Sequence, residues 1–302
     1  MLSLLAPGQG SQKPGMLTDW LELPGATDHV KTWSELTGLD LIRLGTTATA
    51  DEITDTAIAQ PLIVASALLS FEHLGSHEAL PHETIVAGHS VGELTAAALA
   101  GVITPDEAVR LAAIRGAGMA KACALKPGTM AAVLGGDEGE VLDRLSEYDL
   151  VPANRNAIGQ IVAAGAVEGI DKLVDNPPEK ARIRPLAVAG AFHTHFMDPA
   201  QEAFAAAVAE ITPSQPQFTL LSNADGKPVS SGEEALSKIV EQVTSPVRWD
   251  LCTQYMRDQG TAAIVELLPG GTLIGIAKRE LKGVPTRAVK VPADLEDLPG
   301  LG

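Results

Sequence analysis

The sequence predicts an α/β protein with a mainly parallel sheet and an inserted subdomain of ferredoxin-like pattern. Two observations carry this prediction. Short buried strand patterns alternate with longer helical patterns in the first and last parts of the chain, whereas the middle follows a β-α-β-β-α-β order. The chain has 302 residues, of which 45% are hydrophobic, so it can bury an ample core. We predict one domain from residues 1–125 and 190–302, interrupted by an insert at 126–189.

The first part opens with an apolar strand at 2–6 that breaks at a Pro-Gly-Gln-Gly-Ser turn. After a stretch punctuated by proline and glycine, Gln60 and Pro61 open an apolar run that predicts a helix. Proline suits a first helical turn, and Gly75 is placed to cap the C-terminus. The next strand and two helices are predicted over 84–90, 91–101 and 104–124.

The middle of the chain changes pattern. Four strands are predicted there, at 129–134, 151–154, 161–164 and 182–188. Two helices, at 139–148 and 167–174, separate them in the ferredoxin-like order. The α/β alternation then resumes, with strands at 218–222 and 262–267 and helices from Gly232, from Trp249 and over 271–281.

Composition excludes several classes of function. The formal net charge of -16 would repel nucleic acid. Two cysteines, Cys123 and Cys252, fit a reducing compartment rather than a disulfide scaffold. The N-terminus lacks the pattern of a signal peptide, and no uncharged run is long enough to span a membrane. We therefore expect a soluble cytoplasmic protein that binds neither nucleic acid nor membrane.

The sharpest local signal is the segment 88–92, Gly-His-Ser-Val-Gly, between a strand pattern and a helix pattern. That context is typical of a nucleophile elbow, in which glycines let the chain turn tightly and expose a serine at the helix N-terminus. Ser90 is then the candidate nucleophile, and the N–H of Val91 is placed to stabilise an oxyanion. The alternative is a glycine-rich turn with an incidental serine.

A nucleophilic serine needs a base, and the chain has seven histidines. Four of them have irregular spacing or polar surroundings, so a metal site is not expected: His29, His73, His77 and His82. His89 should point away from Ser90 on the turn. His193, in a small-residue loop after a strand, is the preferred base, with His195 as its competitor.

No obvious acid completes a triad. Asp171 and Asp175 lie between Ser90 and His193 in sequence, but both fall in the predicted insert. Either the third member comes from later in the chain, or a neutral carbonyl orients the imidazole. A carbonyl would give a gentler base, suited to thioesters.

Arg115 stands in the middle of a predicted helix, among small and apolar residues. A charge in such a place is rarely buried without a partner. The structural interpretation is an arginine that reaches solvent or pairs with an acid. The functional interpretation is a bidentate clamp for a substrate carboxylate.

Together these residues resemble the malonyl-CoA:acyl carrier protein transacylase family, and the likeness runs nearly from end to end. The matching segments are 6–12, 60–61, 88–92, 115–119, 154–156, 159–160, 190–193, 222–223, 242, 245–249, 266, 269–271 and 278–279. Each match is weak by itself, but so many in order at family-like spacing are a strong signal.

The resemblance implies a hydrolase-like α/β domain with a ferredoxin-like insert, and it implies roles for individual residues. Ser90 would be acylated, His193 would be the base, and the main-chain carbonyl of Gln242 would orient His193. Gln9 and the N–H of Val91 would form the oxyanion hole. Arg115 would clamp the malonyl carboxylate. Gln60, Asn154 and Asn156 match positions that line the same cleft.

Phe192, directly before the histidine, goes with selection of malonyl over methylmalonyl in related acyltransferases. The resemblance implies malonyl-CoA and acyl carrier protein as partners in fatty acid synthesis, with no cofactor and no metal. We also expect a basic rim around the cleft for the acidic carrier, drawn from Arg115, Arg155, Arg182, Arg184, Lys278 and Arg279.

Three alternatives stay open. The first is a serine thioesterase or hydrolase that uses the same Ser90–His193 pair with water. The second is an acyltransferase that serves a polyketide synthase in trans. The third is an interaction subunit that keeps the fold without the activity.

Overall fold

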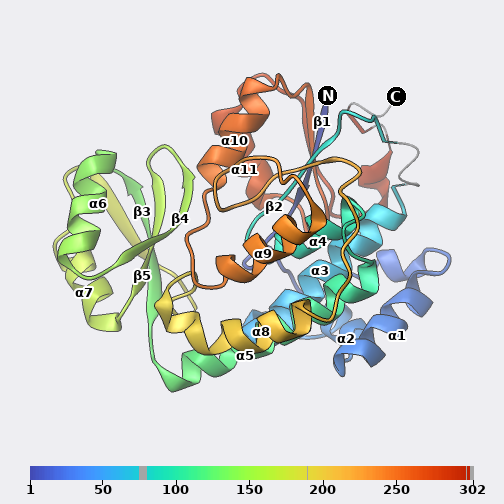
Figure 1. Ribbon diagram of the computed structural model, residues 1–302, viewed down its shortest axis with the longest axis horizontal. Helices are drawn as coiled ribbons and strands as arrows, with labels where there is room; N and C mark the ends of the chain where they lie inside the picture. Colours follow the sequence, from blue (N-terminus) through green and yellow to red (C-terminus); the bar gives the residue numbers. More distant parts are fainter. Residues whose placement is uncertain (75–79, 189, 297, 300–302) are drawn as a thin grey trace.

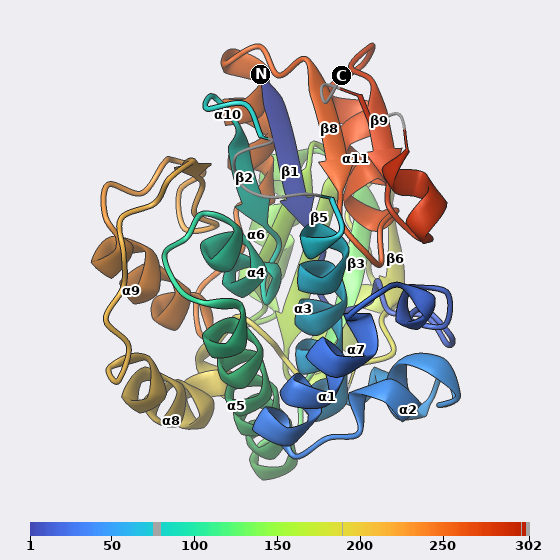
Figure 2. The same cartoon turned by 90° about the vertical axis from the view of Figure 1, so that its right-hand side faces the viewer.

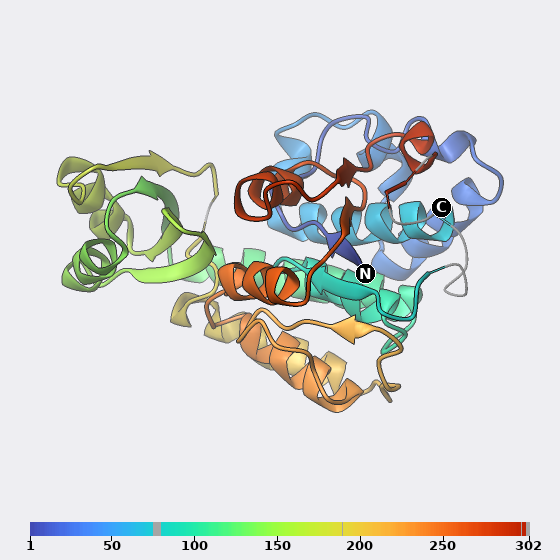
Figure 3. The same ribbon diagram turned by 90° about the horizontal axis from the view of Figure 1, so that it is seen from above.

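The computed structural model describes residues 1–74, 80–188, 190–296 and 298–299. It contains a five-stranded parallel sheet and, beside it, a separate four-stranded antiparallel sheet. The antiparallel sheet and its two helices form a lobe on one side of the molecule (Figure 1; Figure 3). The predicted α/β class and parallel sheet are confirmed.

The parallel sheet has the strand order β7-β2-β1-β8-β9, with β1 at its centre (Figure 2). Every neighbouring pair runs parallel, and Ala6 at the end of β1 pairs with Gly88 at the end of β2. The carboxyl ends of these strands therefore meet at one edge, where α/β proteins bind their ligands. The bounds are β1 Leu2–Ala6, β2 Ile85–Gly88, β7 Thr219–Leu220, β8 Ala263–Glu266 and β9 Thr286–Ala288.

Helices cover both faces of this sheet, as buried parallel strands require. Successive side chains of a strand point to opposite faces, and β1 shows this directly. Leu4 packs into a core with residues of α3, α4 and α5, whereas Leu5 packs into a second core with residues of α10 and α11. The helix bounds are α3 Thr56–Glu72, α4 Gly92–Leu99, α5 Pro105–Leu125, α10 Trp249–Asp258 and α11 Thr272–Glu280.

The antiparallel sheet has the order β4-β5-β3-β6, and its elements follow one another as β-α-β-β-α-β. Its own apolar cluster includes Val133, Leu145 and Ile170. The bounds are β3 Thr129–Gly135, α6 Glu138–Glu147, β4 Val151–Ala157, β5 Gln160–Gly165, α7 Val167–Asp175 and β6 Ala181–Pro185.

The prediction for the end of the last strand in this lobe was wrong. The strand was expected to reach residue 188, but β6 ends at Pro185. Leu186 still donates its N–H to the carbonyl of Met130, and Val188 then turns back to bond Leu186. Residues 186–188 leave the sheet and line the cleft described below.

The start of α3 was also placed wrongly. The helix begins at Thr56, and Asp55 caps it by accepting the N–H of Ala57 at 2.8 Å. Pro61 therefore lies inside the helix rather than in its first turn. A polar N-cap satisfies free N–H groups, so the cap and not the proline sets the start. The predicted cap at Gly75 lies outside the described residues.

Several elements were not predicted. The stretch punctuated by proline and glycine holds two helices, of which α1 is bounded by Gly25 and Gly38 in left-handed conformations. These glycines mark the ends of a helix rather than a loop. The additional elements are η1 Trp20–Glu22, α1 Ala26–Thr37, α2 Leu41–Thr46, η2 Glu52–Thr54, η4 His195–Met197, α8 Asp198–Val208, β9 and η5 Pro292–Leu295. The predicted helix from Gly232 is α9, Gly232–Gln242.

Candidate active site

Ser90 occupies a sharp turn between β2 and α4, with a left-handed backbone at φ 55°. The two flanking glycines make the turn possible. A side chain at Gly88 would overlap the backbone of Gly92, and one at Gly92 would overlap the carbonyl of Ala6. A non-glycine residue at positive φ is strained and needs support. The Ser90 N–H supplies some of it by donating to Asn223 Oδ1 at 2.8 Å.

His193 is in contact with the serine. Its Nε2 lies 2.8 Å from Ser90 Oγ, and its Nδ1 lies 2.8 Å from the main-chain carbonyl oxygen of Gln242. A carbonyl can only accept, so Nδ1 carries the proton and Nε2 is the free base. This geometry agrees with the expectation that a neutral carbonyl orients the imidazole.

The competing candidates lie elsewhere. His195 Nε2 is 3.3 Å from the Lys126 ammonium on an exposed part of the surface. Asp171 and Asp175 lie on α7, in the antiparallel lobe, and are exposed. His89 turns away from Ser90, as expected, and its Nε2 lies 2.8 Å from Asn156 Oδ1.

Arg115 is buried next to the nucleophile, with 1% of its surface exposed. Its Nη1 donates to Gln60 Oε1 at 2.7 Å, and its Nη2 donates to Gln242 Oε1 at 3.0 Å. Nη2 also lies 3.4 Å from Ser90 Oγ, and Nε has no hydrogen-bond partner. Within the described part of the chain, no carboxylate forms an ion pair with Arg115. A buried guanidinium whose hydrogen bonds all go to neutral groups is an electrostatic site for an anion.

Burial and charge shift the pKa values of this cluster. Burial and, after it, the nearby Arg115 charge lower the pKa of His193 to about 3, against the opposing effect of its hydrogen bond to the Gln242 carbonyl. Burial lowers the pKa of Arg115 to about 10. At neutral pH the imidazole is therefore an unprotonated base beside a positive charge.

Two residues in this network were not predicted as site residues. Glu93 lies three positions after Ser90 and is buried, and burial raises its pKa to about 8. Asn223 donates its Nδ2 to the carbonyl of Gly88 at 2.8 Å, so it ties the elbow to the loop after β7. Asn223 was quoted only as part of a matching segment, and Glu93 follows the elbow motif directly.

Ser90 and His193 line a cleft of about 540 Å³ between the two sheets. Gln9, Gln60, Asn154, Asn156 and Phe192 line it as well, so the structure brings these predicted residues together. The lining also includes residues 186–188 and Arg279. Asn154 and Asn156 both lie on β4, which is three residues longer than predicted and therefore includes Asn156.

The two predicted oxyanion donors flank the elbow. The Gln9 side chain donates its Nε2 to Thr56 Oγ1 at 3.1 Å, and no acceptor among the described residues takes the main-chain N–H of Gln9. Val91 is the N-cap of α4, and no acceptor among the described residues takes its N–H. A free N–H at a helix N-terminus favours a developing negative charge.

The sequence matches the model of the acyl transferase domain over residues 4–294. The chain belongs to this family. It is 62% identical to the malonyl CoA-acyl carrier protein transacylase of Mycobacterium tuberculosis (strain H37Rv) over 302 residues, which is 100% of both chains.

Solved structures agree with this result. The crystal structure of MCAT from Mycobacterium tuberculosis superposes with a TM-score of 0.96 at 62% identity, covering 98% of this chain and 99% of that one. A malonyl-transacylase solved in complex with its type II PKS acyl-carrier protein superposes at 0.89, with 31% identity and 97% of each chain covered. The acyl transferase fold is therefore shared over essentially the whole chain.

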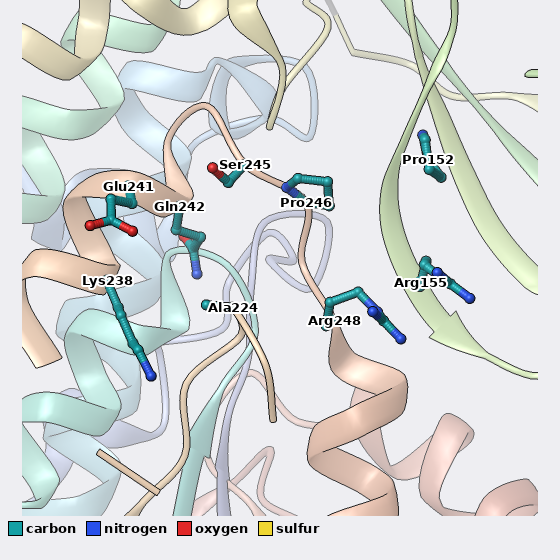
Figure 4. A pocket seen from close by; sticks show the side chains of 9 residues that line it. All are labelled: Pro152, Arg155, Ala224, Lys238, Glu241, Gln242, Ser245, Pro246 and Arg248. Atoms are coloured by element: carbon teal, nitrogen blue, oxygen red, sulfur yellow. The ribbon is translucent and has the colours of Figure 1, made fainter. Parts of the chain in front are cut away.

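A second cavity of about 410 Å³ lies beside Gln242 in this acyl transferase. Figure 4 shows Ser245 and Pro246 between Gln242 and the strand that carries Arg155. Its three cations are already paired with carboxylates: Arg155 with Glu138, Lys238 with Glu234 and Arg248 with Asp250. This cavity therefore offers no free cation of the kind that Arg115 provides.

The described residues of the acyl transferase form neither a metal site nor a membrane-spanning helix. In the ranges that the structure describes, no group of three or more His, Cys, Asp or Glu side chains is arranged to hold a metal ion. No helix built from those residues combines the length and apolar character needed to cross a bilayer.

Proposed function

We propose that this chain transfers the malonyl group of malonyl-CoA to the phosphopantetheine thiol of an acyl carrier protein in fatty acid synthesis. The observation that carries the proposal is the buried Arg115 guanidinium, without an ion pair among the described residues, 3.4 Å from Ser90 Oγ. A thioester with a free carboxylate fits this arrangement, because its carbonyl can react with Ser90 while its carboxylate pairs with Arg115. The names of the relatives support the same substrate pair.

In the first half-reaction, Ser90 Oγ attacks the thioester carbonyl carbon while His193 Nε2 takes its proton. The main-chain N–H groups of Gln9 and Val91 stabilise the oxyanion of the tetrahedral intermediate. The C–S bond then breaks, and His193 returns the proton to the coenzyme A thiolate. Malonyl-Ser90 remains, with its carboxylate on Arg115.

In the second half-reaction, His193 deprotonates the incoming phosphopantetheine thiol, whose sulfur attacks the malonyl ester. Collapse of the intermediate returns the proton to Ser90 Oγ. Every group in this cycle belongs to the chain itself or to one of its two substrates, so the proposed cycle uses no cofactor or metal.

The finer assignments are part of the same proposal. Gln60 holds Arg115, Asn156 holds His89, Asn154 lines the cleft, and Phe192 crowds the α-carbon of the acyl group. The elbow at the strand ends supports a hydrolase-like domain at 1–125 and 190–302. The element order and separate core at 126–189 support a ferredoxin-like subdomain. We also propose a cytoplasmic location.

The basic rim proposed for the carrier protein contains fewer cations than the six that the sequence analysis named. Arg115 is buried and Arg155 is paired with Glu138, so neither belongs to an exposed rim. Arg182 and Arg184 are exposed on β6, Lys278 and Arg279 are exposed in the last turn of α11, and Arg279 also lines the cleft. We propose these four as the cations nearest the docked carrier.

The test is intact-protein mass after brief mixing with malonyl-CoA. We expect a malonyl-sized adduct that persists in buffer and is discharged by added holo acyl carrier protein. An adduct that water clears rapidly would support a thioesterase instead. If no adduct forms under any condition, a non-catalytic interaction subunit becomes the better interpretation. Discharge by several carrier proteins, compared side by side, separates fatty acid from polyketide partners.

The pH profile of acylation gives a second prediction. A base works above its pKa and is lost as pH falls through it. Because the pKa of His193 is lowered to about 3, the rate of acylation by acetyl-CoA, which has no carboxylate for Arg115 to bind, should change less than about twofold between pH 8 and pH 5. A histidine with an ordinary pKa would lose activity roughly 30-fold over that range. Rapid-quench measurement of the adduct distinguishes the two, and a 30-fold fall would contradict the prediction.

A further inference from the structure

Glu93 is a buried carboxylate that the reaction cycle above does not use. It lies in the first turn of α4, with 3% of its surface exposed. Among the described residues, no hydrogen bond joins either of its oxygens to Ser90 Oγ, His193 or the Arg115 guanidinium. Its Oε1 accepts the main-chain N–H of Asn223 at 2.5 Å, and its Oε2 accepts Nε2 of Gln242. Two oxygens that both accept N–H donors are the pattern of a carboxylate.

The second of these bonds decides which way the Gln242 amide points. Gln242 Nε2 faces three acceptors: Glu93 Oε2, Asn223 Oδ1 at 3.0 Å and the Ser90 carbonyl at 3.3 Å. Its Oε1 is thereby directed to the other side, where it accepts Arg115 Nη2 at 3.0 Å. A flipped amide would set a donor against the guanidinium and an oxygen against the carboxylate. Both contacts would be repulsive in a buried site.

Gln242 therefore accepts hydrogen bonds from two active-site residues through two different oxygen atoms. Its main-chain oxygen holds His193 Nδ1 at 2.8 Å, and its side-chain oxygen holds Arg115. The main-chain oxygen is fixed by the end of α9, where Gln242 is the last residue. The side-chain amide, by contrast, depends on its bond to Glu93.

We propose that Glu93 is the positioning residue of the carboxylate clamp: through the Gln242 amide it aims the Arg115 guanidinium at the malonyl carboxylate. This inference rests on the proposed function. Arg115 and Glu93 also attract each other across the amide, which lowers the pKa of Glu93 against the opposing effect of burial. Glu93 thereby contributes to acyl selection without touching the substrate.

The experiment compares kcat/KM for malonyl-CoA and acetyl-CoA in wild type and Glu93→Gln. Glutamine keeps the shape of the side chain but has only one acceptor oxygen. The N–H donors of Asn223 and Gln242 each need an acceptor at this position. We expect kcat/KM for malonyl-CoA to fall roughly 10- to 100-fold more than that for acetyl-CoA, which has no carboxylate to clamp. Glu241→Gln makes the same change on the exposed residue directly before Gln242 in sequence, and it should leave both kcat/KM values unchanged.

Gln242→Met is the second variant, because it removes the amide but keeps the main-chain carbonyl that holds His193. We expect the same malonyl-selective loss, and a double variant that loses no more than the worse single one, since the two residues act in series. Thermal unfolding of each variant confirms that it is folded.

Equal losses for the two thioesters in Glu93→Gln would show a general structural role and overturn the inference, as would unchanged kinetics. Additive losses in the double variant would overturn it as well. If the wild type forms no malonyl adduct, the proposed function fails first, and that result is distinct from any of these.

Discussion

Ser90→Ala is expected to abolish the malonyl adduct and to lower the rate of malonyl transfer by at least about 10⁴-fold. The variant keeps the cleft, the oxyanion donors and the arginine but removes the oxygen that forms the ester. His193 then has nothing to deprotonate in the first half-reaction. Because a ping-pong cycle requires the covalent intermediate, transfer to the carrier thiol should fall with acylation.

Intact-protein mass before and after mixing with malonyl-CoA measures this prediction, and a coupled assay of free coenzyme A gives the rate. Ser237→Ala is the matched control, because Ser237 is exposed on α9 and far from the elbow in sequence. It should acylate like the wild type. A full adduct on Ser90→Ala would place the nucleophile on another residue.

The parts of the site that sequence could predict are those whose signals are local. The strand at 2–6 was placed correctly at both ends, and the elbow follows from the glycines beside Ser90, which have no room for side chains. The capping box of α5, in which Thr104 and Glu107 bond each other, is likewise a signal over four adjacent residues. Interactions between near neighbours are encoded where they occur.

The parts that sequence alone could not derive are contacts between distant segments. Arg115 meets Gln242 across 127 positions, and Gln242 meets Glu93 across 149. No periodicity or spacing encodes such distances, so the residues alone left the orienting group of His193 open and Arg115 with two interpretations. Resemblance to the family supplied the Gln242 carbonyl. Neither route found Glu93, because a charged residue in the first turn of a helix usually serves the helix dipole.

The misplaced helix start shows a different limit. Two helix-start signals lie close together here, Asp55 directly before α3 and Pro61 inside it, and the prediction followed Pro61. The helix that begins after Asp55 has an additional first turn. In this turn Thr56 accepts a hydrogen bond from Gln9, and Gln60, which follows the turn, accepts one from Arg115. A tertiary requirement therefore decided between two local signals that were each plausible.

Arg115→Ala is expected to reverse acyl preference rather than to disable the enzyme. Removing one partner of a buried, charge-assisted contact costs about 2–5 kcal/mol, so kcat/KM for malonyl-CoA should fall roughly 30- to 4,000-fold. Acetyl-CoA makes no use of the guanidinium, and its kcat/KM should stay within about threefold of the wild-type value. The nucleophile and base keep their contact, because the 2.8 Å bond between Ser90 and His193 does not involve Arg115.

Arg115→Lys separates charge from geometry. Lysine keeps the positive charge but lacks the planar fork that holds Gln60, Gln242 and a carboxylate together. If the clamp depends on bidentate geometry, malonyl transfer in Arg115→Lys should lie much closer to the alanine variant than to the wild type. If Arg115→Lys transfers malonyl as fast as the wild type, a positive charge near Ser90 is sufficient to bind the malonyl carboxylate. Equal losses for malonyl-CoA and acetyl-CoA in the alanine variant would contradict the clamp altogether, because selectivity is a difference between two substrates and a general loss leaves that difference unchanged.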